Sequence, residues 1–308
     1  MFLTPPRAVA SVTDERFWGA APAAAAGLWG GMYVVSKWGF SHVPPVTLAF
    51  LRVSLAAVAL LVIVRVSKPA RSFSRRDWLD FLHLGVWVAV TLVTQFVGTD
   101  LTNASQGSLL TVLTPVFTLA LGVAFQSERL TGRKAGGMAL AAAGTVLVLS
   151  GQYDLTRVAD GSLAGVALLL LASLGWAAYT VGGKRLVRTY SALETATYST
   201  LFSVPLIGVL VPAEALLTDA TPTAVPLTAG VVGAVLYLGL LSTAAAWYLW
   251  YKGLEFADAG TVAVFFFVQP LVGAALGATL LGESLGPWFV GGGAAMAAGV
   301  YAVTTARA

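Results

Sequence analysis

The sequence is dominated by apolar stretches of about 20 residues, each long enough to cross a bilayer as a helix. They recur along all 308 residues and are separated by short segments that hold most of the charged side chains. Because backbone polar groups find no water inside a bilayer, such a chain spans it either as α-helices or as a closed barrel of alternating strands. These runs are continuous rather than alternating, so the sequence predicts an all-α membrane protein.

Ten spans are predicted, and composition agrees with them. Hydrophobic residues make up 57% of the chain and charged residues 10%, whereas a soluble domain carries roughly a quarter charged residues. Cysteine is absent, which excludes disulfides, thiol nucleophiles and Cys-based metal sites. The spans cover residues 17–40, 45–65, 78–99, 104–125, 133–150, 162–184, 193–211, 226–252, 258–281 and 286–305.

The positions of the basic residues predict an orientation. If residues 1–16 form a cytoplasmic tail, fifteen of the 18 Lys and Arg residues fall in cytoplasmic segments, and only Arg157 falls in an external loop. Such an imbalance follows the positive-inside rule. We therefore expect a multi-pass protein of the bacterial inner membrane with both termini in the cytoplasm. The basic residues behind the net charge of +4 therefore lie in short loops between spans, and the charge does not indicate a nucleic-acid-binding surface.

An internal repeat joins the two halves of the chain. Asn103-Ala104 corresponds to Asp258-Ala259, Pro115 to Pro270 and Glu128 to Glu283, always 155 residues apart. A Gly-rich span follows each Glu, and a Trp precedes a Lys by eight residues in spans 1 and 6. Five spans per repeat is an odd number, so the copies must insert in opposite directions. The prediction is two inverted five-helix repeats, residues 17–152 and 153–308, with a solute site near the midplane.

The segments that carry this pattern resemble a known family. GLWGGMYVVSKWGF, PPVTLAFLRVSLAAVALL, NASQGSLLTVLTPVFTLALGVAFQSERLTGRKAGGMALAAAG and FADAGTVAVFFFVQPLVGAALGATLLGESL look like the EamA family of the drug/metabolite transporter superfamily. The likeness covers nearly the whole chain, and YddG-type aromatic amino acid exporters look closest. The resemblance implies an exporter of amino acids or related metabolites, but it assigns no substrate residues because the family has no short catalytic motif.

Depth within the spans separates the nine tryptophans into two groups. Six lie near span ends, where the interfacial aromatic belt accounts for them: Trp18, Trp38, Trp78, Trp247, Trp250 and Trp288. Trp29, Trp87 and Trp176 lie near mid-span, and Trp29 and Trp176 occupy matching positions that converge on the pseudo-twofold axis. Packing filler or a lipid-facing ring is the alternative interpretation. Aromatic faces at the midplane suit an amphipathic solute.

Polar residues within spans complete the predicted site. Gln269 precedes Pro270, which frees a backbone carbonyl, and Gln95 shares a helix face with Trp87; each could instead fill an internal hydrogen bond. Pro115 and Pro270 are expected to kink their helices. A cavity between spans 1, 3, 4, 6, 8 and 9 is predicted, with Trp29, Tyr33, Trp87, Gln95, Trp176, Tyr179, Tyr237 and Gln269 as substrate-binding residues.

Two cations lie within spans, Lys37 and Arg52. Snorkelling towards the external interface is one interpretation, and capture of a substrate carboxylate is the other. Neither His42 nor His83 has partners for a metal site, and no cofactor motif occurs, so no metal or cofactor is expected. All fourteen acids fall at interfaces or loops, which favours uncoupled facilitated diffusion over ion coupling.

Three classes of function are compatible with ten spans. An exporter of neutral or amphipathic metabolites fits the aromatic residues and the sparse charge. A transporter of phosphorylated sugars or nucleotide-sugars would require several midplane cations. A membrane enzyme or receptor-like scaffold would show paired carboxylates, His clusters or an activated nucleophile within spans, and the sequence places none there. The expected partners are a small-molecule substrate and the lipid bilayer, without nucleic acid, in a monomer or weak dimer.

The topology can be tested with reporter fusions. Reporters after Ser67, Ser127 and Arg188 are expected to be cytoplasmic, and those at Asp154, Asp219 and Glu283 external. Alkaline phosphatase and fluorescent-protein activities would report each side. A cytoplasmic signal at Glu283 would make the two repeats parallel and would contradict the inverted arrangement.

Overall fold

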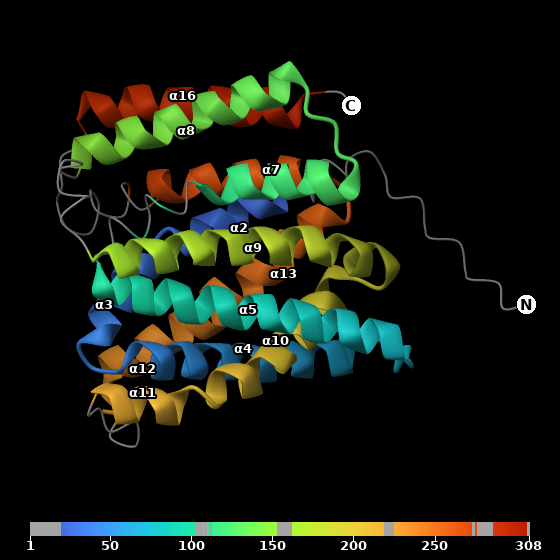
Figure 1. Ribbon diagram of the computed structural model, residues 1–308, viewed down its shortest axis with the longest axis vertical. Helices are drawn as coiled ribbons and strands as arrows, with labels where there is room; N and C mark the ends of the chain where they lie inside the picture. Colours follow the sequence, from blue (N-terminus) through green and yellow to red (C-terminus); the bar gives the residue numbers. More distant parts are fainter. Residues whose placement is uncertain are drawn as a thin grey trace, which may run out of the picture.

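The computed structural model describes residues 20–102, 107, 110, 113–152, 162–218, 225–272, 275 and 286–306. Every regular element in these ranges is helical, which confirms the all-α prediction. The helices run roughly parallel or antiparallel and stack in layers, with α8 (Gly132–Gln152) and α16 (Pro287–Thr304) forming one outer layer (Figure 1).

In the first half, helices are found where the spans are predicted. Span 1 is divided at Gly30 and Gly31 into two short helices. The next three spans, numbered 2 to 4, correspond to one helix each, and α8 completes the half. The elements before α8 are α2 (Ala21–Trp29), α3 (Met32–Phe40), α4 (Pro45–Ser67), α5 (Arg75–Leu101) and α7 (Leu113–Gln126).

In the second half, spans 8 and 9 depart from regular α-helix. Span 8 contains the π-helix η3 and span 9 the 3-10 helix η4, and π-helical stretches are frequently found at functional sites. Pro270 lies four residues after Phe266, so its ring would clash with that carbonyl in a regular helix, and the chain tightens there instead. The elements before α16 are α9 (Leu163–Thr189), α10 (Ala192–Gly208), α11 (Val211–Thr218), α12 (Ala229–Leu236), η3 (Tyr237–Ala245), α13 (Ala246–Leu254), α14 (Ala259–Ala263) and η4 (Val264–Phe267).

Helix pairing follows the internal repeat. Equivalent elements of the two halves pack on each other: α8 on α16, α4 on α10 and α7 on α14. Other contacts occur in pairs that correspond when each element is replaced by its counterpart in the other half. The α5–α9 contact corresponds to the α13–α2 contact, and the α4–η3 contact corresponds to the α10–α5 contact. A twofold relation between the halves produces this pattern.

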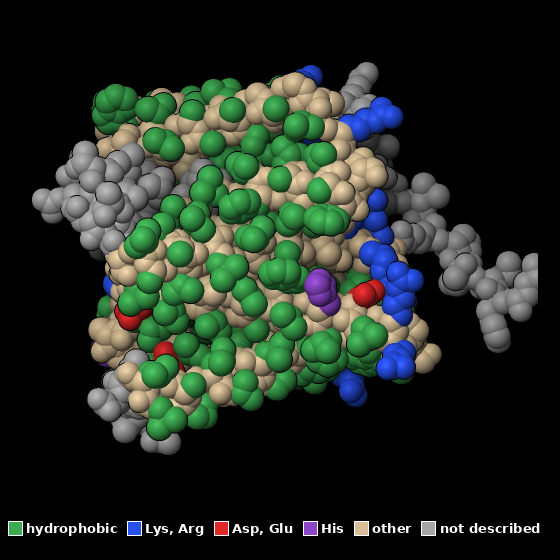
Figure 2. Space-filling model, in the orientation of Figure 1, with side chains coloured by type: hydrophobic (Ala, Val, Ile, Leu, Met, Phe, Trp, Pro, Cys, Tyr) green, Lys and Arg blue, Asp and Glu red, His purple; other side chains and the backbone are tan. Residues whose placement is uncertain are grey.

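The helix directions show that the two halves are inverted. Helix α5 begins at Arg75. Its counterpart in the other half is α13, which has Lys252 in its last turn. Both residues belong to the same end of the molecule, where α4, α9 and α13 finish and α5 and α8 begin; we call it the basic end. Lys and Arg side chains gather there, while hydrophobic side chains cover the face between the two ends (Figure 2). In the described ranges, five helices are long and apolar enough to cross a membrane, and shorter apolar helices accompany them.

Glycines allow close contact between α8 and α16. A Cβ on Gly144 would lie 2.6 Å from the carbonyl oxygen of Gly292, and one on Gly299 would lie 2.5 Å from that of Gly137. Only a residue without a side chain permits such an approach, as is usual between membrane helices. Other glycines do not lie in such contacts, since nothing is within 4 Å of a Cβ on Gly27, Gly132 or Gly136.

These glycines make a matched pair of substitutions available on α8. Gly144→Ala forces two backbones apart and is expected to lower the free energy of unfolding by about 1–3 kcal/mol. Gly136→Ala meets open space and is expected to stabilise the helix by about 0.5–1 kcal/mol. Thermal unfolding in detergent would measure both, and equal effects of the two substitutions would contradict the packing described.

Candidate functional site

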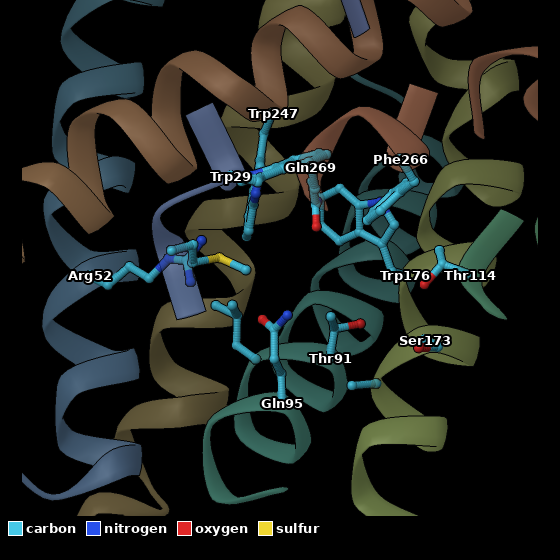
Figure 3. Close-up of a pocket in the computed structure, with 13 residues that line it drawn as sticks. Trp29, Arg52, Thr91, Gln95, Thr114, Ser173, Trp176, Trp247, Phe266 and Gln269 are labelled. Atoms are coloured by element: carbon cyan, nitrogen blue, oxygen red, sulfur yellow. The ribbon is translucent and has the colours of Figure 1, made fainter. Parts of the chain in front are cut away.

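A cavity lies in the interior between both halves of the chain (Figure 3). Its walls come from α2, α3, α4, α5, α7, α9, α13 and η4, and from Gln269 just after η4. The empty space around the lining atoms is about 400 Å³, but the centres of water molecules can occupy only about 30 Å³ of it. That admits about two water molecules. The lining residues are Trp29, Met32, Arg52, Thr91, Leu92, Gln95, Thr114, Ala172, Ser173, Trp176, Trp247, Phe266 and Gln269.

One wall of the cavity is aromatic. Trp29 and Trp176, the matching tryptophans of the two halves, meet edge to face with ring centroids 5.2 Å apart. Phe266 stacks on Trp29 at 5.2 Å, and Trp247 lies 5.4 Å from Trp176. Edge-to-face and offset contacts between such rings are attractive, and the same faces can accept an apolar or cationic group of a solute.

The other side of the cavity carries a buried cation. Arg52, on α4, has 1% of its surface exposed. Its Nε donates to Thr243 Oγ1 at 2.5 Å, and its Nη2 donates to the Ser242 carbonyl at 3.1 Å. The Ser242 carbonyl also accepts from Trp29 Nε1 at 2.8 Å. The π-helix η3 therefore anchors both the cation and the central tryptophan.

Several neutral polar groups also reach the cavity. Gln95 donates from Nε2 to the Tyr33 hydroxyl at 2.8 Å, and Ser173 donates to the Leu110 carbonyl at 3.2 Å. Among the described residues, Thr91 Oγ1 and Trp176 Nε1 are buried without a hydrogen-bond partner. No carboxylate or histidine is among the residues that line the described cavity. The arrangement suits binding of an amphipathic small molecule rather than acid–base chemistry.

At the basic end, an ion cluster joins the two halves. Glu128 accepts from the backbone of Ala259 at 2.9 Å and of Gly260 at 3.2 Å, and Lys184 lies 3.3 Å from its carboxylate. Lys184 also pairs with Asp258 at 2.7 Å. Glu128 is 7% exposed, and a Cβ on Gly122 would lie 2.8 Å from its carboxyl group. The cluster ties the end of α7 to the start of α14 and to α9.

Asp258 is the partly exposed member of this ion cluster. Burial alone would raise the pKa of its carboxyl group. The hydrogen bond and charge of Lys184, with Lys134 and Arg188 nearby, outweigh burial and hold the pKa below its ordinary value. Asp258 is therefore ionised at neutral pH.

At the opposite end, Lys37 is the counterpart of Lys184. Its Nζ donates to the carbonyls of Thr99, Asp100 and Thr102 at 2.8–3.3 Å, and it lies 3.6 Å from the Asp100 carboxylate. The Lys37 side chain is 36% exposed, in keeping with the snorkelling interpretation. Arg52 is buried, so that interpretation is wrong for it. Asn103 and Glu283, the counterparts of Asp258 and Glu128, lie outside the described residues.

The structure brings four of the eight predicted site residues to the cavity: Trp29, Gln95, Trp176 and Gln269. The other four do not line it. The Tyr33 hydroxyl is bonded to Gln95, the Tyr237 hydroxyl donates to the Leu28 carbonyl at 2.7 Å, and the Tyr179 hydroxyl lies 3.2 Å from Ser199 Oγ. Trp87 donates to His83 at 3.0 Å on a half-exposed face of α5. Pro115 lies at the third position of α7, and Pro270 follows η4.

Sequence reasoning missed Trp247 and Phe266, and it offered Arg52 only as one of two alternatives. Trp247 and Trp250 were predicted to belong to the interfacial belt, but they are 1% and 0% exposed. α13 packs on α2 inside the bundle, so both rings face protein rather than lipid. Trp247 lies 5.4 Å from Trp176 and Trp250 lies 5.3 Å from Trp29, at the depth of the central tryptophans. Trp18 lies outside the described residues. No periodicity in span 8 marks the buried face, because nearly every position there is apolar.

Comparison with known proteins gives one family. Residues 17–150 and 163–305 each match the EamA-like transporter family. An uncharacterized transporter of Archaeoglobus fulgidus is 31% identical, covering 91% of this chain and 94% of its own. A probable amino-acid metabolite efflux pump of Salmonella typhimurium is 27% identical, covering 89% and 90%. A solved crystal structure shares the fold with a TM-score of 0.75 at 18% identity, covering 96% of this chain and 98% of that one.

Proposed function

Since the chain belongs to the EamA-like transporter family, it is a multi-pass membrane transporter, and we propose that it exports amino acids and related small metabolites, neutral and aromatic ones included. The observation that carries this proposal is the cavity between the two halves, with Trp29, Trp176 and Phe266 opposite a few polar groups. Aromatic faces suit apolar side chains, and polar groups suit the amino-acid backbone. The similarity to an amino-acid metabolite efflux pump supports the same substrate class.

Transport proceeds by alternating access. The cavity admits only water at its present size, so the aromatic wall must separate to admit a solute. The positive-inside rule puts the basic end in the cytoplasm, as it does both termini. There the cluster of Glu128, Lys184 and Asp258 holds the two halves together. We expect its separation to open a path from the cytoplasm to the cavity. Rocking of one inverted half against the other exposes the site to each side in turn.

Transport is not coupled to protons or sodium. Coupled carriers usually place an ionisable carboxylate or histidine in the membrane interior, where its charge changes with conformation. The acids of the described part of the chain lie at helix ends or between helices, as Asp77, Asp100, Glu128, Glu194, Glu214 and Asp258 do. Solute therefore moves down its own gradient by facilitated diffusion.

The charge of the cavity weighs against the alternative functions. A phosphorylated sugar or nucleotide-sugar carries at least two negative charges and would need several cations. Arg52 is the one cation among the residues that line the described cavity. An enzyme or receptor-like scaffold is less consistent with the family, whose relatives are named as transporters and efflux pumps.

Purified protein in proteoliposomes tests this function. Entry of radiolabelled L-phenylalanine and L-leucine is expected to follow their gradients, and to fall at least about tenfold in Trp29→Ala and Gln269→Ala because each substitution removes part of the cavity wall. Trp288→Ala, at a tryptophan that is 56% exposed on α16, is the matched control and should transport normally. A pH or sodium gradient at zero membrane potential is expected to cause no accumulation.

Two results would contradict the proposal. Absence of saturable flux for either amino acid would refute the substrate class. Uphill accumulation driven by a pH or sodium gradient would refute uncoupled diffusion and leave the substrate class standing.

A further inference from the structure

The guanidinium group of Arg52 is held in one orientation with one nitrogen left over. Its Nε bonds to Thr243 Oγ1, and its Nη2 bonds to both the carbonyl and the hydroxyl of Ser242, at 3.1 and 3.3 Å. Nη1 is buried and has no hydrogen-bond partner among the described residues. Phe96 lies on another side, with its ring centroid 5.4 Å from the guanidinium carbon. Arg52 lines the cavity and its guanidinium group points into it, so Nη1 is the donor left for a bound group (Figure 3).

No protein anion balances this charge in the described part of the chain. Arg52 forms no ion pair there, although its side chain is almost fully buried. The described acids have other partners: Asp100 pairs with Lys37, Glu128 and Asp258 with Lys184, and Glu194 with Arg71. The Glu214 carboxylate accepts from the backbone of Val46 and Thr47 at the start of α4. An unpaired buried cation is costly in a membrane interior, so a bound anion would be strongly favoured.

The shape of the cavity restricts what that anion can be. Arg52 reaches the space from one side, with Trp176 and Phe266 on the far side and Gln95 and Thr91 between them (Figure 3). A solute with its anionic group at Arg52 would therefore place its body against aromatic rings. A single guanidinium edge matches one carboxylate, whereas a phosphate dianion would need further cations.

We propose that Nη1 of Arg52 binds the carboxylate of the transported solute, and that the site selects monocarboxylates with an apolar or aromatic body. This inference rests on the proposed function and narrows its substrate class. No carboxylate among the residues that line the cavity offers a charge to an ammonium group. An α-amino group is therefore tolerated but not required, and an amine without a carboxylate is rejected.

Four compounds of similar size differ in whether they carry a carboxylate, an amino group or both: L-phenylalanine, 3-phenylpropionate, L-phenylalaninamide and phenethylamine. Binding to the purified full-length protein is measured by calorimetry. The parent protein is expected to bind the two carboxylates about 10- to 100-fold more tightly than the amide and the amine, the range of one charge-assisted hydrogen bond. Arg52→Gln is expected to reduce carboxylate binding to the level of the amide.

Two further variants keep the test decisive. Arg52→Lys keeps the charge but cannot hold the same bonds to η3, so carboxylate binding should weaken several-fold while amide binding is unchanged. Lys37→Gln removes the second cation that was predicted within a span, and Lys37 does not line the cavity. This variant should therefore prefer carboxylates as the parent does. Size-exclusion profiles establish that each variant is folded.

The outcomes distinguish this inference from the proposed function. Carboxylate binding that is unchanged in Arg52→Gln and Arg52→Lys, or a parent that does not prefer carboxylates, overturns the inference even if proteoliposomes transport L-phenylalanine. Arg52-dependent carboxylate binding without amino-acid flux supports the carboxylate site and refutes amino-acid export.

Discussion

At the cavity, one backbone carbonyl, that of Ser242, links the two halves of the chain. It accepts hydrogen bonds from Trp29 Nε1 and Arg52 Nη2, so both donors come from the first half and the acceptor from the second. Neither donor would find water in a bilayer interior, and an unpaired polar group there is costly. The π-helix that contains Ser242 thus fixes the aromatic wall and the cation of the cavity together. Under the proposed function, a local departure from α-helix in span 8 positions two components of the solute site.

Inverted symmetry relates this site to the two ends of the molecule. Trp29 and Trp176 meet near the axis, while Lys37 and Lys184, eight residues beyond them, lie at opposite ends. Lys184 is 12% exposed and engages two carboxylates of the ion cluster, whereas Lys37 is 36% exposed and bonds mainly to carbonyls. Under the proposed mechanism the two ends exchange these states, so that the end now closed by Glu128 opens as the other closes.

The sequence predicted much of the fold and about half of the site. Span positions follow from hydropathy, the odd number of spans in each repeat predicted the inversion, and the matching positions of Trp29 and Trp176 predicted that these two residues approach each other. It was harder to predict which side chains face lipid and which face protein, because a helix that is apolar on every side has no hydrophobic periodicity. Trp247 and Trp250 were misplaced for that reason. The burial of Arg52 depends on the π-helix, which no residue pattern in span 8 indicates.

The most direct test of alternating access is a distance measurement at both ends. The chain has no cysteine, so spin labels can be attached to introduced cysteines alone. One pair, Leu130→Cys with Thr189→Cys, spans the basic end, and the other, Ser41→Cys with Leu227→Cys, spans the opposite end. Glu128→Gln weakens the ion cluster. Double electron–electron resonance is expected to show that this substitution lengthens the distance between the labels at the basic end and shortens the distance at the opposite end. Two distances that stay fixed, or that lengthen together, would contradict the mechanism.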